Sequence, residues 1–175
     1  MKYFKNILIF LLLLNTLYAS EFDKITTFEA TFTQTITNSS GNIVIYKGTL
    51  HIKKPNKIKW QYKTPIEKFV YIKRYTVTII EPELEQAIIT KLDKEINIFK
   101  LLKNAKKIAG NTYLSNFNNI NYTLVFKNNK LHKIIYKDEI ENDIVLLFTN
   151  VLQNHKIDEK IFKFFIPLEF DIIKK

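Results

Sequence analysis

The chain has 175 residues, with 27 Lys and Arg against 17 Asp and Glu, which gives a formal net charge of +10. It has no cysteine, which excludes disulfides, thiolate metal sites, a cysteine nucleophile and lipid attachment to a cysteine of this chain. This length fits one domain that can bury a core without covalent cross-links.

The N-terminus has the pattern of a signal peptide. Two lysines precede an uncharged apolar run at 7–14, and Ala19 offers a cleavage point before the first acidic residue. The run is shorter than the ~20 apolar residues of a membrane-spanning helix. We therefore expect a cleaved signal at 1–19 and an exported domain at 20–175, and an uncleaved anchor is the alternative.

Most of the chain that follows predicts an antiparallel meander. Phe22, Ile25, Phe28 and Phe32 first indicate a short helix with Ser20 and Asp23 as its N-terminal capping residues. Apolar and polar residues then alternate in runs that Asn, Pro and Gly separate, with no alternating helices that would favour a parallel sheet. The expected strands are 29–37, 42–53, 57–63, 67–73, 75–81, 85–90, 120–127, 131–137, 143–149 and 160–166.

Lys54 stands where an apolar side chain is expected. Leu50 and Ile52 lie on the inner face of their strand, so the next inward position is Lys54. A cation on an apolar face needs partners, and the carbonyls at a helix C-terminus are suitable ones. In the alternative interpretation, the strand ends at Lys53 and the turn directs Lys54 into solvent.

One segment interrupts the alternation. Its apolar residues recur at every third position, Asp93 can cap a helix, and Gly110 stands where a helix C-terminus favours positive φ. We expect a helix of about 14 residues that lies against the inner face of the sheet. The recurring residues are Ile96, Phe99, Leu102, Ala105 and Ile108.

No motif indicates an enzyme or a cofactor. His51, His132 and His155 are far apart in the sequence, and the chain has only three glycines, too few for a phosphate-binding loop. No serine lies in a G-x-S-x-G elbow. We therefore expect no catalytic residues, no metal and no cofactor.

Nucleic-acid binding is disfavoured despite the positive charge. The aromatic residues Trp60 and Tyr62 share the face of Ile58 and not that of the neighbouring lysines. Arginine, the side chain that best reads bases and phosphates, occurs once.

Two sequence blocks resemble the outer-membrane lipoprotein carrier family, LolA. The first is F-x-A-x-F-x-Q at 28–34, and the second is G-x-L-x-I-x-K-P with a tryptophan five residues later, at 48–60. Thr64-Pro65, Pro82 and the run 162–167 add weaker matches, so the similarity covers about residues 22 to 172.

The resemblance implies a mainly β fold with α, in which an antiparallel sheet curls into an incomplete half-barrel and helices cover the open side as a lid. It also implies a periplasmic monomer that carries acylated lipoproteins from the inner-membrane LolCDE transporter to an outer-membrane acceptor, LolB or an equivalent. A lipoprotein-sensing or regulatory module on the same fold is the alternative.

The resemblance also assigns roles to residues. An arginine in the family matches Lys54 and contacts the backbone of the lid, which makes Lys54 a lid latch, although lysine lacks the planar fork of arginine. Arg74 and Glu169 stand where the family usually has turn glycines. The basic residues Lys57, Lys59, Lys73 and Arg74 are candidates for partner docking. Residues expected to line the acyl-chain cavity, or else to form an ordinary core without ligand, are Phe28, Phe32, Leu50, Ile52, Ile58, Trp60, Tyr62, Leu101 and Leu102.

Overall fold

The structure is a computed structural model that describes residues 21–91 and 98–175. The predicted signal peptide and the proposed cap Asp93 lie outside the described residues. Among the described residues, no helix is long and apolar enough to cross a membrane.

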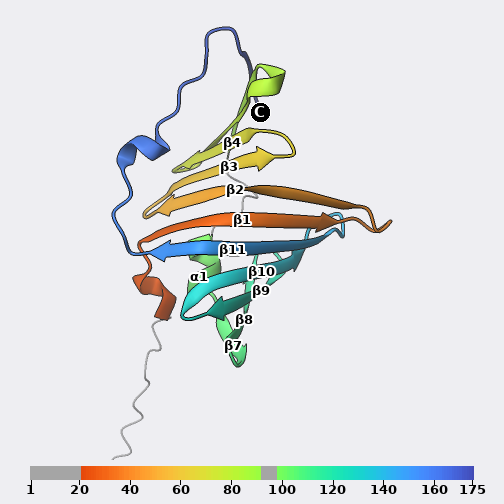
Figure 1. Ribbon diagram of the computed structural model, residues 1–175, viewed down its shortest axis with the longest axis vertical. Coiled ribbons are helices and arrows are strands. Elements are labelled where there is room, and N and C mark those ends of the chain that lie inside the picture. Colours follow the sequence, from red (N-terminus) through yellow and green to blue (C-terminus); the bar gives the residue numbers. More distant parts are fainter. Residues whose placement is uncertain (1–20, 92–97) are drawn as a thin grey trace, which may run out of the picture.

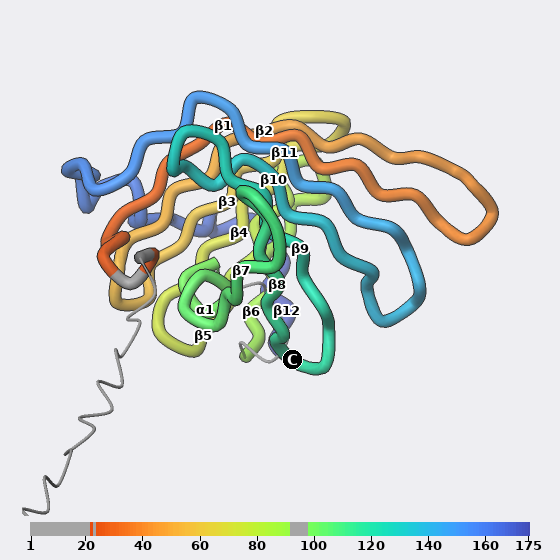
Figure 2. Tube along the Cα trace, turned by 90° about the horizontal axis from the view of Figure 1, so that it is seen from below, coloured from red at the N-terminus to blue at the C-terminus, as the bar shows by residue number. Residues whose placement is uncertain are grey.

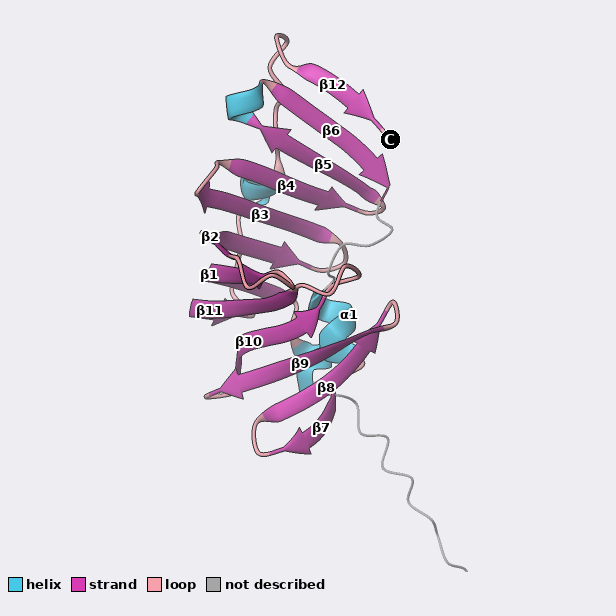
Figure 3. Ribbon diagram, turned by 90° about the vertical axis from the view of Figure 1, so that its right-hand side faces the viewer, coloured by secondary structure: helices cyan, strands magenta, loops and turns pink. Residues whose placement is uncertain are grey.

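Twelve strands form one open sheet in the order β12-β6-β5-β4-β3-β2-β1-β11-β10-β9-β8-β7 (Figures 1 and 3). Neighbouring strands are antiparallel, except that β12 runs parallel to β6. The edge strands β7 and β12 are only four residues long. The bounds are β1 (Thr27–Thr37), β2 (Ile43–Lys53), β3 (Lys57–Thr64), β4 (Lys68–Lys73), β5 (Thr76–Glu81), β6 (Gln86–Lys91), β7 (Lys106–Ala109), β8 (Thr112–Phe117), β9 (Ile120–Lys127), β10 (Lys130–Lys137), β11 (Asp143–Gln153) and β12 (Asp171–Lys174).

Little of the described chain is helical. The α-helix α1 (Ile98–Lys103) has six residues, and three short 3₁₀ turns complete the set: η1 (Glu21–Lys24), η2 (Pro82–Leu84) and η3 (Glu159–Phe162). Seen along the sheet, the strands arch over α1, which lies on the concave side (Figure 2).

The prediction that helices cover the open side as a lid is wrong. The expected helix of 14 residues ends at Lys103, and the sequence after it forms the hairpin of β7 and β8. Gly110 has the predicted positive φ, +48°, but it lies in the turn of that hairpin. Apolar spacing alone did not separate helix from strand here, and the unpaired edge of β9 stabilises the alternative because it offers a partner for β8.

Three smaller expectations also fail. The N-terminal helix is only the turn η1, and Phe28 belongs to β1. The strand expected at 160–166 is replaced by η3 and an irregular segment, and the C-terminal strand β12 was not predicted. This segment runs outside β3 and β4 before it adds β12 beside β6 (Figure 1).

The alternation predicted from the sequence places the core on the concave face. Strand pairing places residues of β1 to β5 directly opposite one another. One such row of buried side chains begins at Phe28 of β1. The helix adds Ile98, Leu101 and Leu102, each at most 1% exposed. Full burial of one such side chain contributes about 2 kcal/mol, so this layer dominates the stability of the fold. The row runs Phe28, Ile52, Ile58, Ile72, Val77.

Candidate functional site

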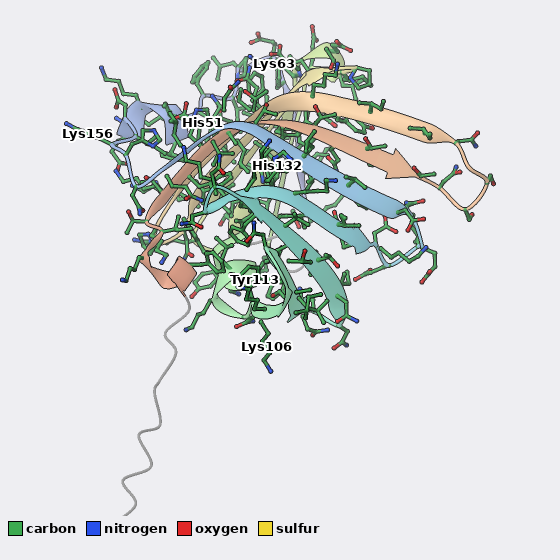
Figure 4. The ribbon with its side chains drawn as sticks, turned by 60° about the horizontal axis from the view of Figure 1, so that its bottom comes forward. His51, Lys63, Lys106, Tyr113, His132 and Lys156 are labelled. Atoms are coloured by element: carbon green, nitrogen blue, oxygen red, sulfur yellow. The ribbon has the colours of Figure 1, made fainter. Side chains whose placement is uncertain are left out.

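The candidate site is the concave apolar face beneath α1. The structure brings all nine predicted cavity residues into one hydrophobic cluster, where eight are buried and Tyr62 is partly buried. Tyr113 of β8 lies beside α1 and packs against the same cluster (Figure 4). Because the lining is aliphatic and aromatic, it suits hydrocarbon.

Aromatic rings organise the centre of this face. The ring of Phe32 meets Trp60 edge-on at 5.0 Å and Tyr62 at 5.2 Å between centroids. The ring centroid of Phe28 in β1 lies 5.5 Å from that of Phe148 in β11. This contact extends the aromatic cluster from β1 to the neighbouring strand on its other side. Such pairs stabilise a fixed ring arrangement beyond their burial alone.

Gly48 provides the space that Phe32 occupies. A Cβ at Gly48 would lie 1.8 Å from the carbonyl oxygen of Gln61 and 2.9 Å from the Phe32 ring. Only glycine therefore lets β2 approach β3 at this point, where the ladder also shifts register.

α1 packs against part of the concave face, beside η1 and β8. Ile98, Leu101 and Leu102 fill the space that the predicted cavity would offer, so the lining residues form a packed core. A long apolar ligand in this space would have to displace the packed side chains of α1. Such a displacement would uncover apolar side chains from both α1 and the strands.

Lys54 points toward the helix. Its side chain is half-buried, and its Nζ lies 5.2 Å from the centroid of the Phe99 ring in α1. Its backbone N–H donates to the carbonyl oxygen of Thr26 at 2.9 Å. The inward position expected from the alternation therefore carries a cation over an aromatic ring of α1, and the latch role stays a prediction.

The four predicted docking residues lie close together on β3, β4 and the turn after β4, where Lys57 is the register partner of Lys73, and their docking role stays a prediction. Lys57 pairs with Glu159, and Lys59 lies 5.6 Å from the ring centroids of both Phe69 and Tyr71. Burial lowers the pKa of Lys59. Lys73 and Arg74 are exposed at the turn between β4 and β5, where Arg74 has φ +59°, so this turn forms without the glycine of the family.

Sequence reasoning missed an acidic clasp on the convex side. The two carboxylate oxygens of Glu159 accept hydrogen bonds from Lys53 and Lys57, each at 2.6 Å. These hydrogen bonds lower the pKa of Glu159 to about 2. The clasp holds the C-terminal segment against β3, and its members are too far apart in the chain for a local pattern to predict.

A second missed group joins Glu29 to two histidines. His155 Nε2 lies 2.9 Å and His51 Nε2 3.7 Å from the Glu29 carboxylate. Burial lowers the pKa of His51, and the nearby Glu29 carboxylate opposes that effect. Glu29 and His51 are register partners, so the ladder could have indicated this pair, whereas His155 is 126 residues from Glu29. Among the described residues, no cluster of three or more side chains is arranged to hold a metal.

Comparison with known proteins gives consistent results. Residues 23–118 match the family model described as outer membrane lipoprotein carrier protein LolA. The outer-membrane lipoprotein carrier protein of Campylobacter jejuni is 35% identical over 170 residues, which cover 97% of this chain and 99% of that protein. The protein of the same name from Wolinella succinogenes is 30% identical over 155 residues, 88% of this chain and 90% of that protein.

Solved structures support the fold alone, because their sequence identities are low. An uncharacterized conserved protein from Thermus thermophilus has a TM-score of 0.55 at 9% identity and covers 90% of this chain and 95% of its own. A LolA superfamily protein from Nitrosomonas europaea has a TM-score of 0.50 at 10% identity, with 80% and 91% covered.

Proposed function

The chain belongs to the LolA family of outer-membrane lipoprotein carrier proteins, and from this we propose that it binds the acyl chains of lipoproteins on its concave face and carries them through the periplasm. The observation that carries the proposal is the continuous apolar face of the sheet, against which α1 packs in the described part of the chain. The role is binding and transfer, with no chemical step.

The acyl chains of the cargo have to be shielded from water during transfer. Each methylene buried from water is worth about 0.8 kcal/mol, so three long acyl chains exposed together cost on the order of 30 kcal/mol. Free diffusion of the cargo is therefore excluded. Unloading has to occur by direct contact, with the chains sliding from one apolar surface to the next.

Competition between α1 and acyl chains for the same apolar cluster would suit a carrier that must also release its cargo. The empty protein packs Leu101 and Leu102 against the sheet, and this packing has to be given up before acyl chains can bind. That cost lowers the net affinity, as for any ligand that selects a minor conformation. We propose Lys54 as a latch in this step, because its Nζ stacks on Phe99 of α1.

The proposed partners are the inner-membrane LolCDE transporter as donor and an outer-membrane acceptor, LolB or an equivalent. Positive charge favours approach to anionic membranes, and Lys73 and Arg74 are exposed for docking. Cleavage of residues 1–19 would release the domain into the periplasm.

The test is to purify the protein from periplasm and to analyse bound material by mass spectrometry. Acylated peptides are expected to co-purify, and the loaded protein should pass them to acceptor-containing vesicles. Recovery without acylated peptides, together with no extraction of lipoprotein from membrane vesicles, would refute the proposal.

A further inference from the structure

Strands β10 and β11 pair over only part of their length. Their ladder runs from Lys137 opposite Asp143 to Lys133 opposite Leu147 and stops there. β11 continues to Gln153 and stays paired with β1 on its other side. Figure 1 shows β10 diverging from β11 toward the end of β11. Within the described chain, no strand pairs with residues 148–153 on the side that faces β10.

Two irregularities open this split. On β11, Leu152 pairs with Glu29 but Thr149 pairs with Thr31, so two residues stand opposite one, and Asn150 has φ +53°. On β10, the register against β9 shifts between Leu131 and Lys133, around His132. Such bulges bend a strand away from its partner and are commonly placed next to functional sites.

Side chains, and not a strand, satisfy the backbone along the open edge. Lys130 Nζ donates to the carbonyl oxygen of Val151 at 2.9 Å, and His132 Nδ1 lies 3.2 Å from the carbonyl oxygen of Phe148. Backbone carbonyls of a strand are the normal partners of N–H groups from a neighbouring strand. An added strand could supply those donors if the two side chains swing aside.

The split between β10 and β11 forms a cleft that borders the apolar site. The cleft is open and has a volume of about 640 Å³, with Leu131 and Phe148 in its wall. Both residues belong to the hydrophobic cluster of the candidate site, and the Phe148 ring contacts Phe28. A molecule in the split would therefore touch the same core that we propose for acyl chains.

The charges of the split favour a neutral or acidic occupant. Its basic side chains are Lys127, Lys130 and His132, and its lining residues include no carboxylate. The open edge from 148 to 153 can pair with about five residues of an extended chain, at ~3.3 Å per residue.

Resting on the proposed function, we infer that the split binds the polypeptide segment directly after the acylated residue of the cargo, as a strand added beside β11. The acyl chains would lie on the core side and the peptide would leave through the split. Pairing of this kind uses main-chain hydrogen bonds, so one carrier can accept cargo of many sequences.

A cross-linking experiment tests this inference. Because the chain has no native cysteine, an introduced cysteine is the only thiol that can react. The probe is a triacylated lipopeptide with a ten-residue Ser/Asn/Asp extension that carries one cysteine at its fifth residue, activated as its mixed disulfide with thionitrobenzoate. Attack by the thiolate of the protein then forms the new disulfide and releases thionitrobenzoate. The variant Thr149→Cys places a thiol in the split, and Thr76→Cys, an exposed strand threonine on β5, is the matched control. Native mass spectrometry reports whether each variant loads the probe.

We expect both variants to load, and Thr149→Cys to form the disulfide with the probe at least tenfold faster than Thr76→Cys. A probe with alternate backbone amides N-methylated cannot pair as a strand, and it should lose this preference while it still loads. Equal trapping at both positions, or trapping that N-methylation leaves unchanged, would overturn the added strand while the carrier function stands. No loading at all would overturn the proposed function and this inference with it.

Discussion

The two flanks of the central strand β1 differ in regularity. On the β2 side, the ladder runs through β6 with one register shift, at Gly48, and the C-terminal segment is clasped to its convex face through Glu159. On the β11 side, the register shifts at β11, β10 and β7, and α1 packs against β8. We expect the regular β2 side, called here the fixed wall or fixed flank, to keep its shape, and the irregular β11 side, called here the movable flank, to contain any parts that move.

The largest expected effect is on the fixed wall. Gly48→Val should lower the free energy of unfolding by about 4 kcal/mol or more, because the added Cβ collides with the backbone of β3 and cannot be relieved by a rotamer change. Urea denaturation measures the change. Thr49→Val, at the neighbouring half-buried position, is the control and should change stability by less than ~0.5 kcal/mol. A native-like Gly48→Val protein would show that this flank is as adaptable as the other.

A mutation that leaves a cavity between α1 and the sheet tests whether the packing of α1 opposes binding. Leu101→Ala should cost about 3 kcal/mol of stability, because Leu101 is fully buried between α1 and the sheet. Since the closed form is weakened, binding of a triacylated lipopeptide should become tighter, as titration calorimetry can measure. The exposed Leu168 supplies the control variant Leu168→Ala, for which neither quantity should change. Weaker lipopeptide binding by Leu101→Ala would mean that α1 is part of the binding surface and not its cover.

Removal of the charge at the latch should change function more than stability. Lys54→Met keeps the stem but loses the cation over Phe99, an interaction worth at most about 1 kcal/mol. We expect a folded protein whose rates of lipopeptide loading and release are altered, as stopped-flow transfer between vesicles would detect. Lys63→Met, at an exposed position on β3, is the matched control. Unaltered rates in Lys54→Met would exclude Lys54 from the mechanism.

The smallest effect concerns the acidic clasp. The pKa of Glu159 in the fold, about 2, is below its usual value of 4.5, so the folded state binds the proton more weakly than the unfolded state. The clasp thus stabilises the fold above pH 4.5, and this contribution is lost as the pH falls toward 2. In Glu159→Gln, thermal unfolding between pH 5 and pH 2 should depend less steeply on pH than in the parent. Glu83→Gln, in the exposed turn η2, should keep the parent slope.

Local alternation was enough to predict the fixed flank. At 48–62, apolar residues at every second position gave both strands and their inward faces, since one buried face imposes a period of two. The same reasoning placed Lys54 inward. Local alternation could not predict that β1 pairs with β11, because β11 follows β1 by more than 100 residues.

The movable flank could not be predicted for a related reason. At 104–110 the apolar spacing suits a helix or a hairpin, and only the partner β9 decides between them. The split depends on bulges near Asn150 and His132, which no periodicity marks. The apolar lining was predictable because burial selects residue type, whereas the contact of α1 with it is a matter of tertiary packing.

The short edge strands have a consequence for self-association. β7 carries Lys106 and Lys107, and β12 ends at Lys174, with Lys175 directly after it. A second molecule that extended the sheet at either edge would pair with only four residues of backbone, next to positively charged side chains. Long bare edges seed fibrils, and lysine-bearing short ones do not. The sheet can therefore stay open, and even loosen its α1-covered side, without polymerising.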